Sequence, residues 1–271
     1  MDADKQLKVL TWNVNKAAES RSALWDAVRR EEADVVLLQE VVRLPADLQS
    51  SYNCRVVTPT YFRGGSAPFA TAILSKGEMD TRQFLTSRFG WVNRIQSQHH
   101  GWILESEVTT GSGTTLRVVS VHSPAFAIPT KNLLHSEFAG IKLANNPRLW
   151  ITEILWALLR DSDTPEETNW VVGGDFNSSV LFDHPRDRGN GEIIRRMNAL
   201  GLKDCLSYYM DGDVPTFRHS GGSITHQLDY CYVSAGLLER LRSARVLSHQ
   251  EVFGPTPKLS DHLPIVCESD F

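Results

Sequence analysis

The stretch VVGGDFNSSV, residues 171–180, joins an apolar run directly to a polar segment. Val171 and Val172 suit a buried strand, and the two glycines that follow allow backbone angles that other residues avoid. Asp175 and Asn177 are ordinary turn residues, because their side chains hydrogen-bond to nearby backbone. They also stand two positions apart, so an extended chain presents both on one side, as a site for phosphate and a hard cation requires. The rest of the chain has to decide between a turn and a site.

Similar apolar, β-branched runs return along the whole chain. They are LKVLTWNV, ADVVLLQE, CRVVT, FATAILS, GWILESEV, TLRVVSVH, NWVVGGD, LDYCYVS and LPIVCES. Their recurrence without a long linker predicts one layered domain over residues 1–271. The stretch TTGSGTTL predicts a hairpin loop between two strands, so part of the sheet is antiparallel. We therefore expect an α/β fold with mixed sheets and helices outside.

Three segments between these strands show helical patterns. SRSALWDAVRREE places Leu24 and Val28 on one face. NNPRLWITEILWALLRD is expected to begin with Asn146 as its N-cap and Pro147 at the first helical position. GEIIRRMNALG ends at Gly201, a typical helix stop. These helices are expected to cover the outer faces of the sheets.

The composition is ordinary for a folded protein, with 41% hydrophobic and 22% charged residues. Lys+Arg 28 against Asp+Glu 32 gives a net charge of −4, so no overall positive field attracts nucleic acid. A local basic surface or a bound divalent cation can attract it instead. The charge therefore counts only mildly against a nucleic-acid substrate.

The cellular compartment is suggested by what the sequence lacks. The beginning MDADKQLKVL has no basic and apolar signal pattern, and no apolar run approaches the length of a membrane span. Cys54, Cys205, Cys231 and Cys267 form no C-x-x-C pair, and we expect them to be buried, reduced thiols. The sequence thus predicts a soluble cytoplasmic protein with no membrane partner.

Polar side chains that a strand end does not need follow six of the predicted strands. Strand ends along one edge of a sheet converge on one crevice, so these side chains are expected to meet there. In chain order they are Asn13, Glu40, His122, the pair Asp175 and Asn177, Asp229, and the pair Asp261 and His262.

The same motifs resemble the endonuclease/exonuclease/phosphatase superfamily, which contains deoxyribonuclease I and exonuclease III. The order W-N, Q-E, H, G-D-x-N, L-D-Y and S-D-H runs from Trp12 to His262, and FATAILS resembles the usual G-x-x-A-I-L-S strand of that family. The resemblance implies a four-layer α/β/β/α sandwich of two mixed β-sheets. It also implies a divalent-metal phosphodiesterase site at one end of the sheets.

Phosphodiester hydrolysis asks for the same residue types. The anionic substrate repels an attacking oxygen, so an enzyme needs a cation, a positioned water and donors to the developing oxyanion. Mg²⁺ prefers one or two carboxylates, which predicts Glu40 as principal ligand with Asn13 and Asp261 beside it, and Mn²⁺ is the alternative ion. Asp175 then orients or deprotonates the water, and Asn177 donates to the phosphoryl oxygen.

The two histidines are expected to act on the phosphate. Asp229 would hold His262 in one orientation, and His262 would contact the phosphate or act as base. His122 resembles the histidine of the deoxyribonuclease I branch, where abasic-site endonucleases carry a tyrosine. The resemblance implies a role as phosphate ligand or leaving-group acid.

The leading hypothesis is a Mg²⁺-dependent enzyme that hydrolyses nucleic acid, with DNA favoured as the partner. TYFRGG and SRFGWVNR mix aromatic and basic residues that can stack on bases and contact phosphates, or that pack loops onto the core. The segment at residues 123–146 is expected to wall one side of the cleft. The alternatives are a phosphatase or phosphodiesterase acting on a small nucleotide or phosphorylated lipid head group, and an inactive binding module on the same fold.

Overall fold

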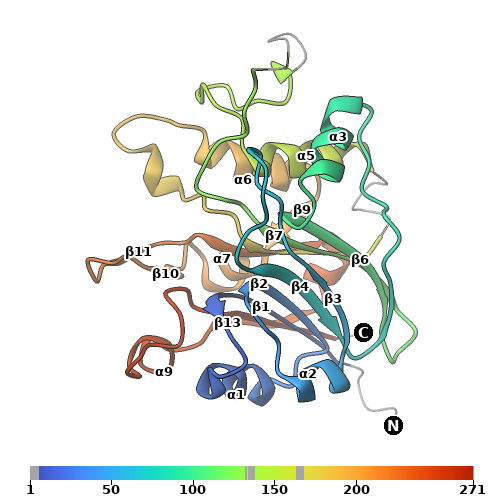
Figure 1. The fold of residues 1–271 in the computed structure, drawn as a ribbon, viewed down its shortest axis with the longest axis vertical. Coiled ribbons are helices and arrows are strands. Elements are labelled where there is room, and N and C mark those ends of the chain that lie inside the picture. Colours follow the sequence, from blue (N-terminus) through green and yellow to red (C-terminus); the bar gives the residue numbers. More distant parts are fainter. Residues whose placement is uncertain (1–5, 132, 134–137, 163–167, 271) are drawn as a thin grey trace.

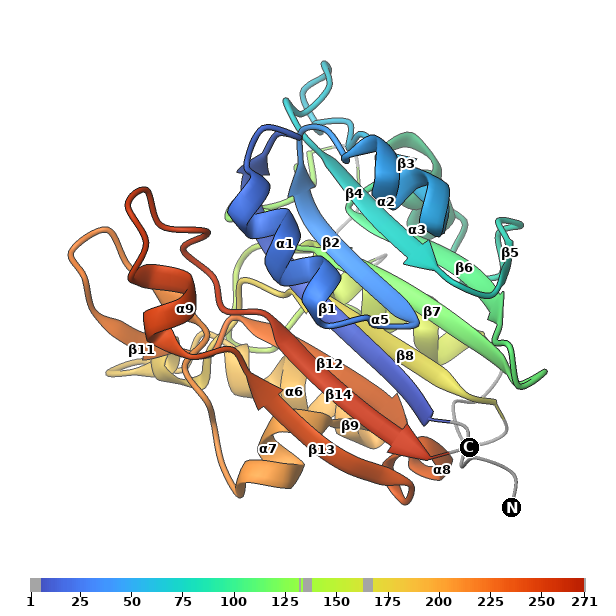
Figure 2. The same ribbon diagram turned by 90° about the horizontal axis from the view of Figure 1, so that it is seen from below.

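The computed structural model describes residues 6–131, 133, 138–162 and 168–270. Two six-stranded sheets pack face to face, and helices cover their outer faces (Figures 1 and 2). The predicted four-layer α/β/β/α sandwich of two mixed sheets is therefore confirmed.

The first sheet holds both ends of the described chain. Its strands are β1 (Gln6–Ala17), β2 (Val35–Val41), β3 (Asn53–Val57), β4 (Ala70–Ser75), β13 (Leu241–Val246) and β14 (Ile265–Asp270). They are arranged in the order β13-β14-β1-β2-β4-β3. β1 and β2 are parallel, whereas the other pairs are antiparallel. The first and last strands are thus hydrogen-bonded neighbours.

The second sheet has the order β5-β6-β7-β8-β12-β9. Its strands are β5 (Glu78–Asp80), β6 (Ile103–Thr109), β7 (Thr115–His122), β8 (Trp170–Asp175), β9 (Leu202–Asp204) and β12 (Asp229–Ser234). Only β7 and β8 run parallel among its paired strands in the described part of the chain. β6 and β7 form the predicted hairpin, with Thr109 opposite Thr115.

The helices divide between the two outer faces. α1 (Ser22–Arg30), α2 (Ala46–Ser51) and α9 (His249–Phe253) cover the first sheet, and α3 (Gly90–Gln98), α5 (Ile151–Asp161) and α6 (Asn190–Ala199) cover the second. The remaining elements are η1 (Val180–Asp183), α7 (Cys205–Met210), α8 (Ala235–Leu238) and the hairpin strands β10 (Phe217–Arg218) and β11 (Ile224–His226). Among the described residues, no helix has both the length and the apolar character of a membrane span.

Strand β1 shows why the sandwich forms. Leu7 and Val9 belong to the cluster between the two sheets, whereas Leu10 and Trp12 belong to the cluster beneath α1. Successive strand residues point to opposite faces, so an apolar run fills both layers at once. The apolar runs of the sequence therefore predict strands that are covered on both faces.

Helix α5 begins four residues later than expected. Its N-cap is Trp150, not Asn146, because Glu153 accepts hydrogen bonds from the backbone N–H groups of Trp150 (2.7 Å) and Leu143 (2.8 Å). The amide oxygen of Asn146 instead accepts from the backbone N–H of Arg148, which closes a local turn. The predicted Pro147 start is wrong for this reason.

The cysteines are all free, and one of them is exposed. Cys205, Cys231 and Cys267 are buried as expected, but Cys54 is exposed. It lies on the edge strand β3, whose one hydrogen-bonded neighbour among the described strands is β4. The prediction that all four thiols are buried is therefore wrong at this position.

The two glycines before Asp175 have different roles. Gly174 has a φ of +143°, and a Cβ there would overlap the carbonyl oxygen of Val121 on β7. A Cβ on Gly173 would lie 3.0 Å from a methyl group of Leu37, which can move. Only Gly174 lets the parallel strands β7 and β8 approach each other at the end of β8.

Gly174→Ala is therefore expected to lower the free energy of unfolding by roughly 3 kcal/mol or more, since backbone has to move. Gly173→Ala is the matched control and is expected to have a clearly smaller effect. Urea unfolding followed by circular dichroism measures both. Equal losses would show that the close approach of the two strands is not the reason for Gly174.

Candidate active site

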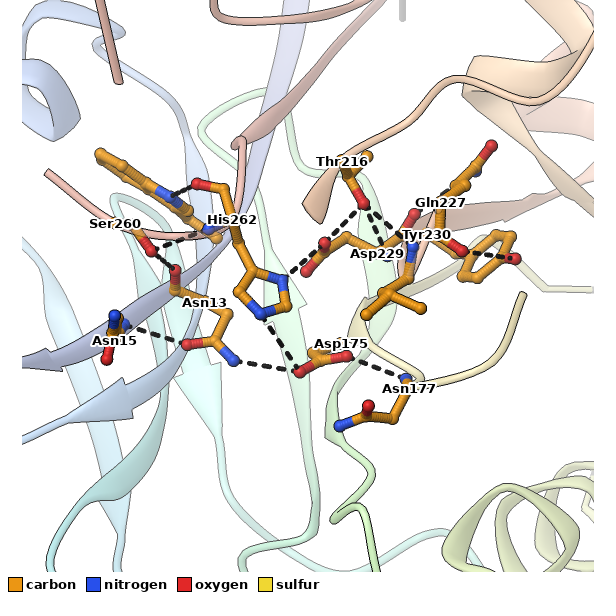
Figure 3. Close-up of polar contacts among 12 residues, drawn as sticks. Asn13, Asn15, Asp175, Asn177, Thr216, Gln227, Asp229, Tyr230, Ser260 and His262 are labelled. Atoms are coloured by element: carbon orange, nitrogen blue, oxygen red, sulfur yellow. Dashed lines mark hydrogen bonds and ion pairs between the residues drawn. The ribbon is translucent and has the colours of Figure 1, made fainter. Parts of the chain in front are cut away.

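Five of the predicted site residues come together at one edge of the two sheets: Asn13, Asp175, Asn177, Asp229 and His262 (Figure 3). Glu40 joins them through Asn13, and His122 lies beside Glu40. In the second sheet, Asp175 on β8 is the register partner of both His122 on β7 and Asp229 on β12. In the first sheet, Asn13 lies near the end of β1 and Glu40 near the end of β2. The site is thus built from both layers of the sandwich.

Asn13 connects the two sheets through its side-chain amide. Its Nδ2 donates to Asp175 Oδ2 at 3.0 Å and more weakly to Glu40 Oε1 at 3.4 Å. The other oxygen of Asp175, Oδ1, accepts from the backbone N–H of Asn177 at 2.8 Å. The buried Asp175 carboxylate is therefore held at both oxygens, with its plane fixed between the sheets.

His262 and Asp229 form a buried pair. His262 Nδ1 lies 2.8 Å from Asp229 Oδ2, and the hydroxyl of Thr216 donates to the same oxygen at 2.7 Å. The other ring nitrogen, Nε2, lies 3.9 Å from Asp175 Oδ2. Asp229 thus fixes the imidazole so that its far edge faces Asp175 (Figure 3).

Asn177 reaches toward the chain that follows β7. Its Nδ2 donates to the carbonyl oxygen of Ser123 at 3.0 Å, and its backbone has a φ of +49°. Asparagine tolerates this left-handed conformation better than most residues, which suits the amide to this position. The segment GDFN thus forms a local turn, and it also brings the polar groups of Asp175 and Asn177 to the same edge of the sheet.

His122 occupies an aromatic environment. Its buried ring lies 5.2 Å from Phe69 and 5.3 Å from Trp102, measured between centroids. Burial lowers the pKa of His122 to about 3, with smaller effects from His262 and Lys16. The sequence offered no carboxylate partner for this histidine, and the structure places Glu40 Oε1 3.6 Å from its Nε2.

Glu40 has an unusual backbone. Its φ is +57°, in the left-handed region that favours glycine, and the pairing of β2 with β4 shifts between Leu38 and Val41. Strained backbone of this kind is concentrated at functional sites, where the surrounding structure enforces it. Burial raises the pKa of the Glu40 carboxyl, and the hydrogen bond from Asn13 partly offsets this effect.

The site carries more negative than positive charge. Burial raises the pKa of Asp175, and Asp229 adds to this effect while His262 opposes it. For His262, burial disfavours the imidazolium, but the Asp229 and Asp175 carboxylates outweigh it and raise the pKa. Asp261 is half-buried, and its charge further raises the pKa of Glu40. An added cation would stabilise all of these carboxylates in their charged forms.

Two parts of the site differ in what they can bind. The ligand atoms of Asp175, Asp229 and His262 lie within 4.8 Å of one another, but hydrogen bonds among themselves and with Thr216 already engage this group. Glu40 accepts only the long bond from Asn13 among the described residues. The carboxylate oxygens of Glu40 and Asp261 are of the type that Mg²⁺ prefers, so these two residues fit a hard divalent cation. The predicted ligand Asn13 is oriented differently, because its Oδ1 accepts from the backbone N–H of Asn15 at 3.0 Å and its Nδ2 faces Glu40.

Two supporting residues were not predicted. Ser260 donates through its hydroxyl to the carbonyl oxygen of Asn13 at 2.7 Å and accepts from the backbone N–H of His262 at 3.1 Å. Its position two residues before His262 in LSDH was a usable signal, because serine often hydrogen-bonds to backbone two residues on. Thr216 gave no such signal, because it contacts Asp229, 13 residues away in the sequence, only in the folded chain.

The two segments that mix aromatic and basic residues have different surroundings. SRFGWVNR packs against a helix, and TYFRGG lies near the site. Arg88 of SRFGWVNR pairs with Asp161, and Trp91 is buried, so this segment packs against α5. Tyr61 of TYFRGG contacts Trp102, which contacts His122. Parts of the segment at residues 123–146 line a cavity beside Asn177, as expected, and residues 132 and 134–137 lie outside the described part.

The fold is shared with solved structures of nucleases. An AP endonuclease from Archaeoglobus fulgidus superposes with a TM-score of 0.67 at 17% identity, covering 96% of this chain and 98% of its own. The 3' phosphatase NExo from Neisseria, bound to a product DNA hairpin, has a TM-score of 0.65 at 19% identity and covers 98% and 100%. The AP endonuclease LMAP from Leishmania major has a TM-score of 0.64 at 16% identity and covers 98% and 88%. At these identities the similarity establishes the fold alone.

Sequence comparison supplies the family. No curated protein sequence matches the chain. The model of the "Endonuclease/Exonuclease/phosphatase family" matches residues 10–262, a range that contains every predicted site residue. Because this match covers nearly all of the sequence, the chain is a phosphoric ester hydrolase of the endonuclease/exonuclease/phosphatase family, and not a binding module.

Proposed function

We propose that the protein is a Mg²⁺-dependent phosphodiesterase that hydrolyses nucleic acid, with DNA as the favoured substrate. The observation that carries this proposal is the convergence of carboxylates, amides and histidines from both sheets on one edge. Asn13 joins Glu40 and Asp175 within this group, and Asp229 fixes His262. A cation ligand, a water-orienting carboxylate and phosphate-binding groups then lie within reach of a single phosphate.

Glu40 would hold the metal ion, with Asp261 beside it. Asn13 would join them as a ligand once its amide turned its oxygen from the backbone N–H of Asn15 toward Glu40. The ion supplies charge neutralisation for the phosphate and for the developing oxyanion. Mn²⁺ accepts the same oxygen ligands and is the expected substitute. The Glu40 carboxylate, on a left-handed backbone, lies 3.4 Å from the amide nitrogen of Asn13 and 3.6 Å from Nε2 of His122.

Asp175 and Asn177 would act on the attacking water and the phosphoryl oxygen. Asp175 is held by Asn13 and by the backbone N–H of Asn177, so its remaining lone pairs have fixed directions for a water proton. Asn177 offers a neutral donor, which suits a phosphoryl oxygen because a carboxylate there would repel it. Asn177 therefore contacts the phosphate without adding negative charge, whereas the Asp175 carboxylate faces the attacking water.

The histidines would contact the phosphate from two sides. His262 presents Nε2 toward Asp175, and its Nδ1 is engaged by Asp229, so it can bind the phosphate or exchange a proton with the water. His122 presents Nε2 toward Glu40. Because burial lowers its pKa to about 3, the neutral ring would bind the phosphate through an N–H, and it would protonate the leaving group only once the bound phosphate had raised its pKa. Asp229 positions His262 and does not itself touch the substrate.

Nucleic acid is favoured over smaller phosphoesters by the similar structures. Two of them are AP endonucleases, and a third is a 3' phosphatase whose structure contains product DNA. The alternative remains a small nucleotide or phosphorylated lipid head group. Incubation of the protein and MgCl₂ with circular DNA, linear DNA, RNA and a panel of phosphomonoesters distinguishes them. Release of phosphate from monoesters without cleavage of any nucleic acid would refute the proposal.

Glu40→Gln is expected to raise the Mg²⁺ concentration needed for half-maximal activity by about tenfold or more, since it removes the principal charged ligand. Glu78→Gln, at an exposed position on β5, is the control and should change nothing. Titration of activity with MgCl₂ measures this, and excess EDTA should abolish activity of the wild type. Full activity in EDTA would contradict the metal assignment.

A further inference from the structure

A cavity of about 290 Å³ lies beside Asn177. Its walls come from the segment after β7, the start of α5, η1 and the start of α6, and they include Ser123, Trp150, Phe176, Phe182 and Arg188. Ser123 follows His122 directly and accepts the hydrogen bond from Asn177. The cavity therefore opens next to the position proposed for the phosphate.

Phe182 gives this cavity an aromatic wall. Its ring is half-buried and stacks on His226, with centroids 4.3 Å apart and planes 28° apart. His226 is in turn held by Ser179, whose hydroxyl lies 3.2 Å from the histidine Nδ1. One face of Phe182 is thus covered and its orientation is fixed, while the residue still lines the cavity.

Arg188 gives the same cavity a positive charge. The backbone of Arg188 is fixed, because its N–H donates to Asp183 at 2.9 Å and its carbonyl accepts from Asn146 at 3.0 Å. Its side chain is exposed and has no ion pair among the described residues. A guanidinium on a rigid loop, next to an aromatic wall, can bind an anion that accompanies a flat ring.

Trp150 adds further aromatic surface to the wall. Its backbone N–H is held by Glu153, and its indole Nε1 is buried without a hydrogen-bond acceptor among the described residues. This nitrogen is closed off from the cavity, so Trp150 contributes the surface of its indole to the wall and not a hydrogen bond. The cavity thus combines aromatic surface with one cation.

We propose that this cavity binds the nucleoside next to the phosphate that is hydrolysed, with its base on Phe182 and the following phosphate on Arg188. This inference rests on the proposed function and names the part of the substrate that the site selects. The volume of about 290 Å³ lies at the small end of the range for ligand pockets and leaves room for one base. The base has to leave its neighbours in the strand to enter, so flexible or single-stranded substrates should be preferred.

The test uses substrates that share one leaving group. They are the nitrophenyl esters of thymidine 5'-phosphate, thymidine 3'-phosphate and methyl phosphate, together with a thymidine dinucleotide ester that carries one further phosphate. Phe182→Ala should lower kcat/KM about tenfold on one of the two thymidine nitrophenyl esters, by raising KM. It should leave kcat/KM on the methyl ester unchanged. Arg188→Ala should lower kcat/KM about fivefold only on the dinucleotide, and less at high salt.

Two variants serve as matched controls. Arg186→Ala removes an exposed guanidinium from the same loop, and Tyr208→Ala removes an exposed aromatic ring on α7, and neither residue lines the cavity. Both should behave as the wild type. Equal losses on the methyl and thymidine esters with Phe182→Ala, or no loss on either, would overturn the inference while leaving the phosphodiesterase function in place.

Failure of the proposed function gives a different result. A wild type that hydrolyses neither these esters nor DNA or RNA with Mg²⁺ would refute that function. Binding of thymidine monophosphate, measured by calorimetry, then still tests the cavity. The inference is supported if Phe182→Ala weakens this binding about tenfold and Tyr208→Ala does not weaken it. It is overturned if Phe182→Ala leaves the binding unchanged.

Discussion

His262→Ala is expected to lower turnover by about 10³-fold or more while the protein stays folded, because it removes the group that faces both Asp175 and the phosphate. The same change leaves Asp229 buried without its imidazole partner, so some stability will also be lost. His262→Asn is the second variant to use, since its amide nitrogen can still donate to Asp229 but does not reach as far as Nε2. His249→Ala, on the exposed start of α9, is the control.

Asp229→Asn should lower turnover less, by about 10- to 100-fold, because Asp229 only orients the imidazole. The double change Asp229→Asn with His262→Ala should then cost little beyond His262→Ala alone. Single-turnover rates and melting temperatures on the same preparations measure this coupling. Losses that multiply would mean that the two residues act separately, and Asp229 would lose its positioning role.

Asp175→Asn and Asn177→Ala are each expected to lower turnover by about 10²-fold or more in folded protein. If GGDFN were only a turn, each change would alter stability by at most about 1 kcal/mol and leave the rate nearly normal. Asp175→Asn removes a charge that burial and Asp229 disfavour, but its NH₂ group cannot accept the hydrogen bond of Asn13 or Asn177, so the melting temperature should change little.

The chain offers close controls for both changes. Asp80 accepts a hydrogen bond from the backbone N–H of Arg82, two residues on, as Asp175 does from Asn177. Asn53 donates through Nδ2 to a backbone carbonyl, that of Gly77, as Asn177 does to Ser123. Asp80→Asn and Asn53→Ala should therefore affect stability without affecting the rate. Two folded site variants with normal rates would return residues 173–177 to the role of a turn.

The sequence predicted the layers and the location of the site because both depend on local patterns. Leu10 and Trp12 alternate with Val9 and Thr11 in β1, and such a strand needs cover on both faces. Asp175 ends β8, and Asp229 begins β12. Because β8 and β12 run antiparallel, these two residues, 54 positions apart in the sequence, are register partners at the same edge of the sheet.

What the sequence did not reveal depends on contacts between distant segments. The start of α5 is set by Glu153, whose carboxylate binds two backbone N–H groups, one of them ten residues away at Leu143. Its burial raises the pKa of Glu153 to about 7, which shows how far this contact departs from a surface cap. The local Asn146-Pro147 pattern therefore predicts the wrong start, because the contact between Glu153 and the backbone of Leu143 forms only in the folded chain.

The bond from Asn13 to Asp175, 3.0 Å long, joins the two facing sheets, and Gln39 on β2 and Ser120 on β7 form a second such bond of 3.0 Å. Neither sheet by itself contains a complete set of working groups. A compact denatured state that kept its strands but let the two layers slide against each other would consequently be inert. The enzymatic rate therefore depends on how the two sheets are aligned. On heating or acidification, we expect the rate to fall before the strand content measured by circular dichroism does.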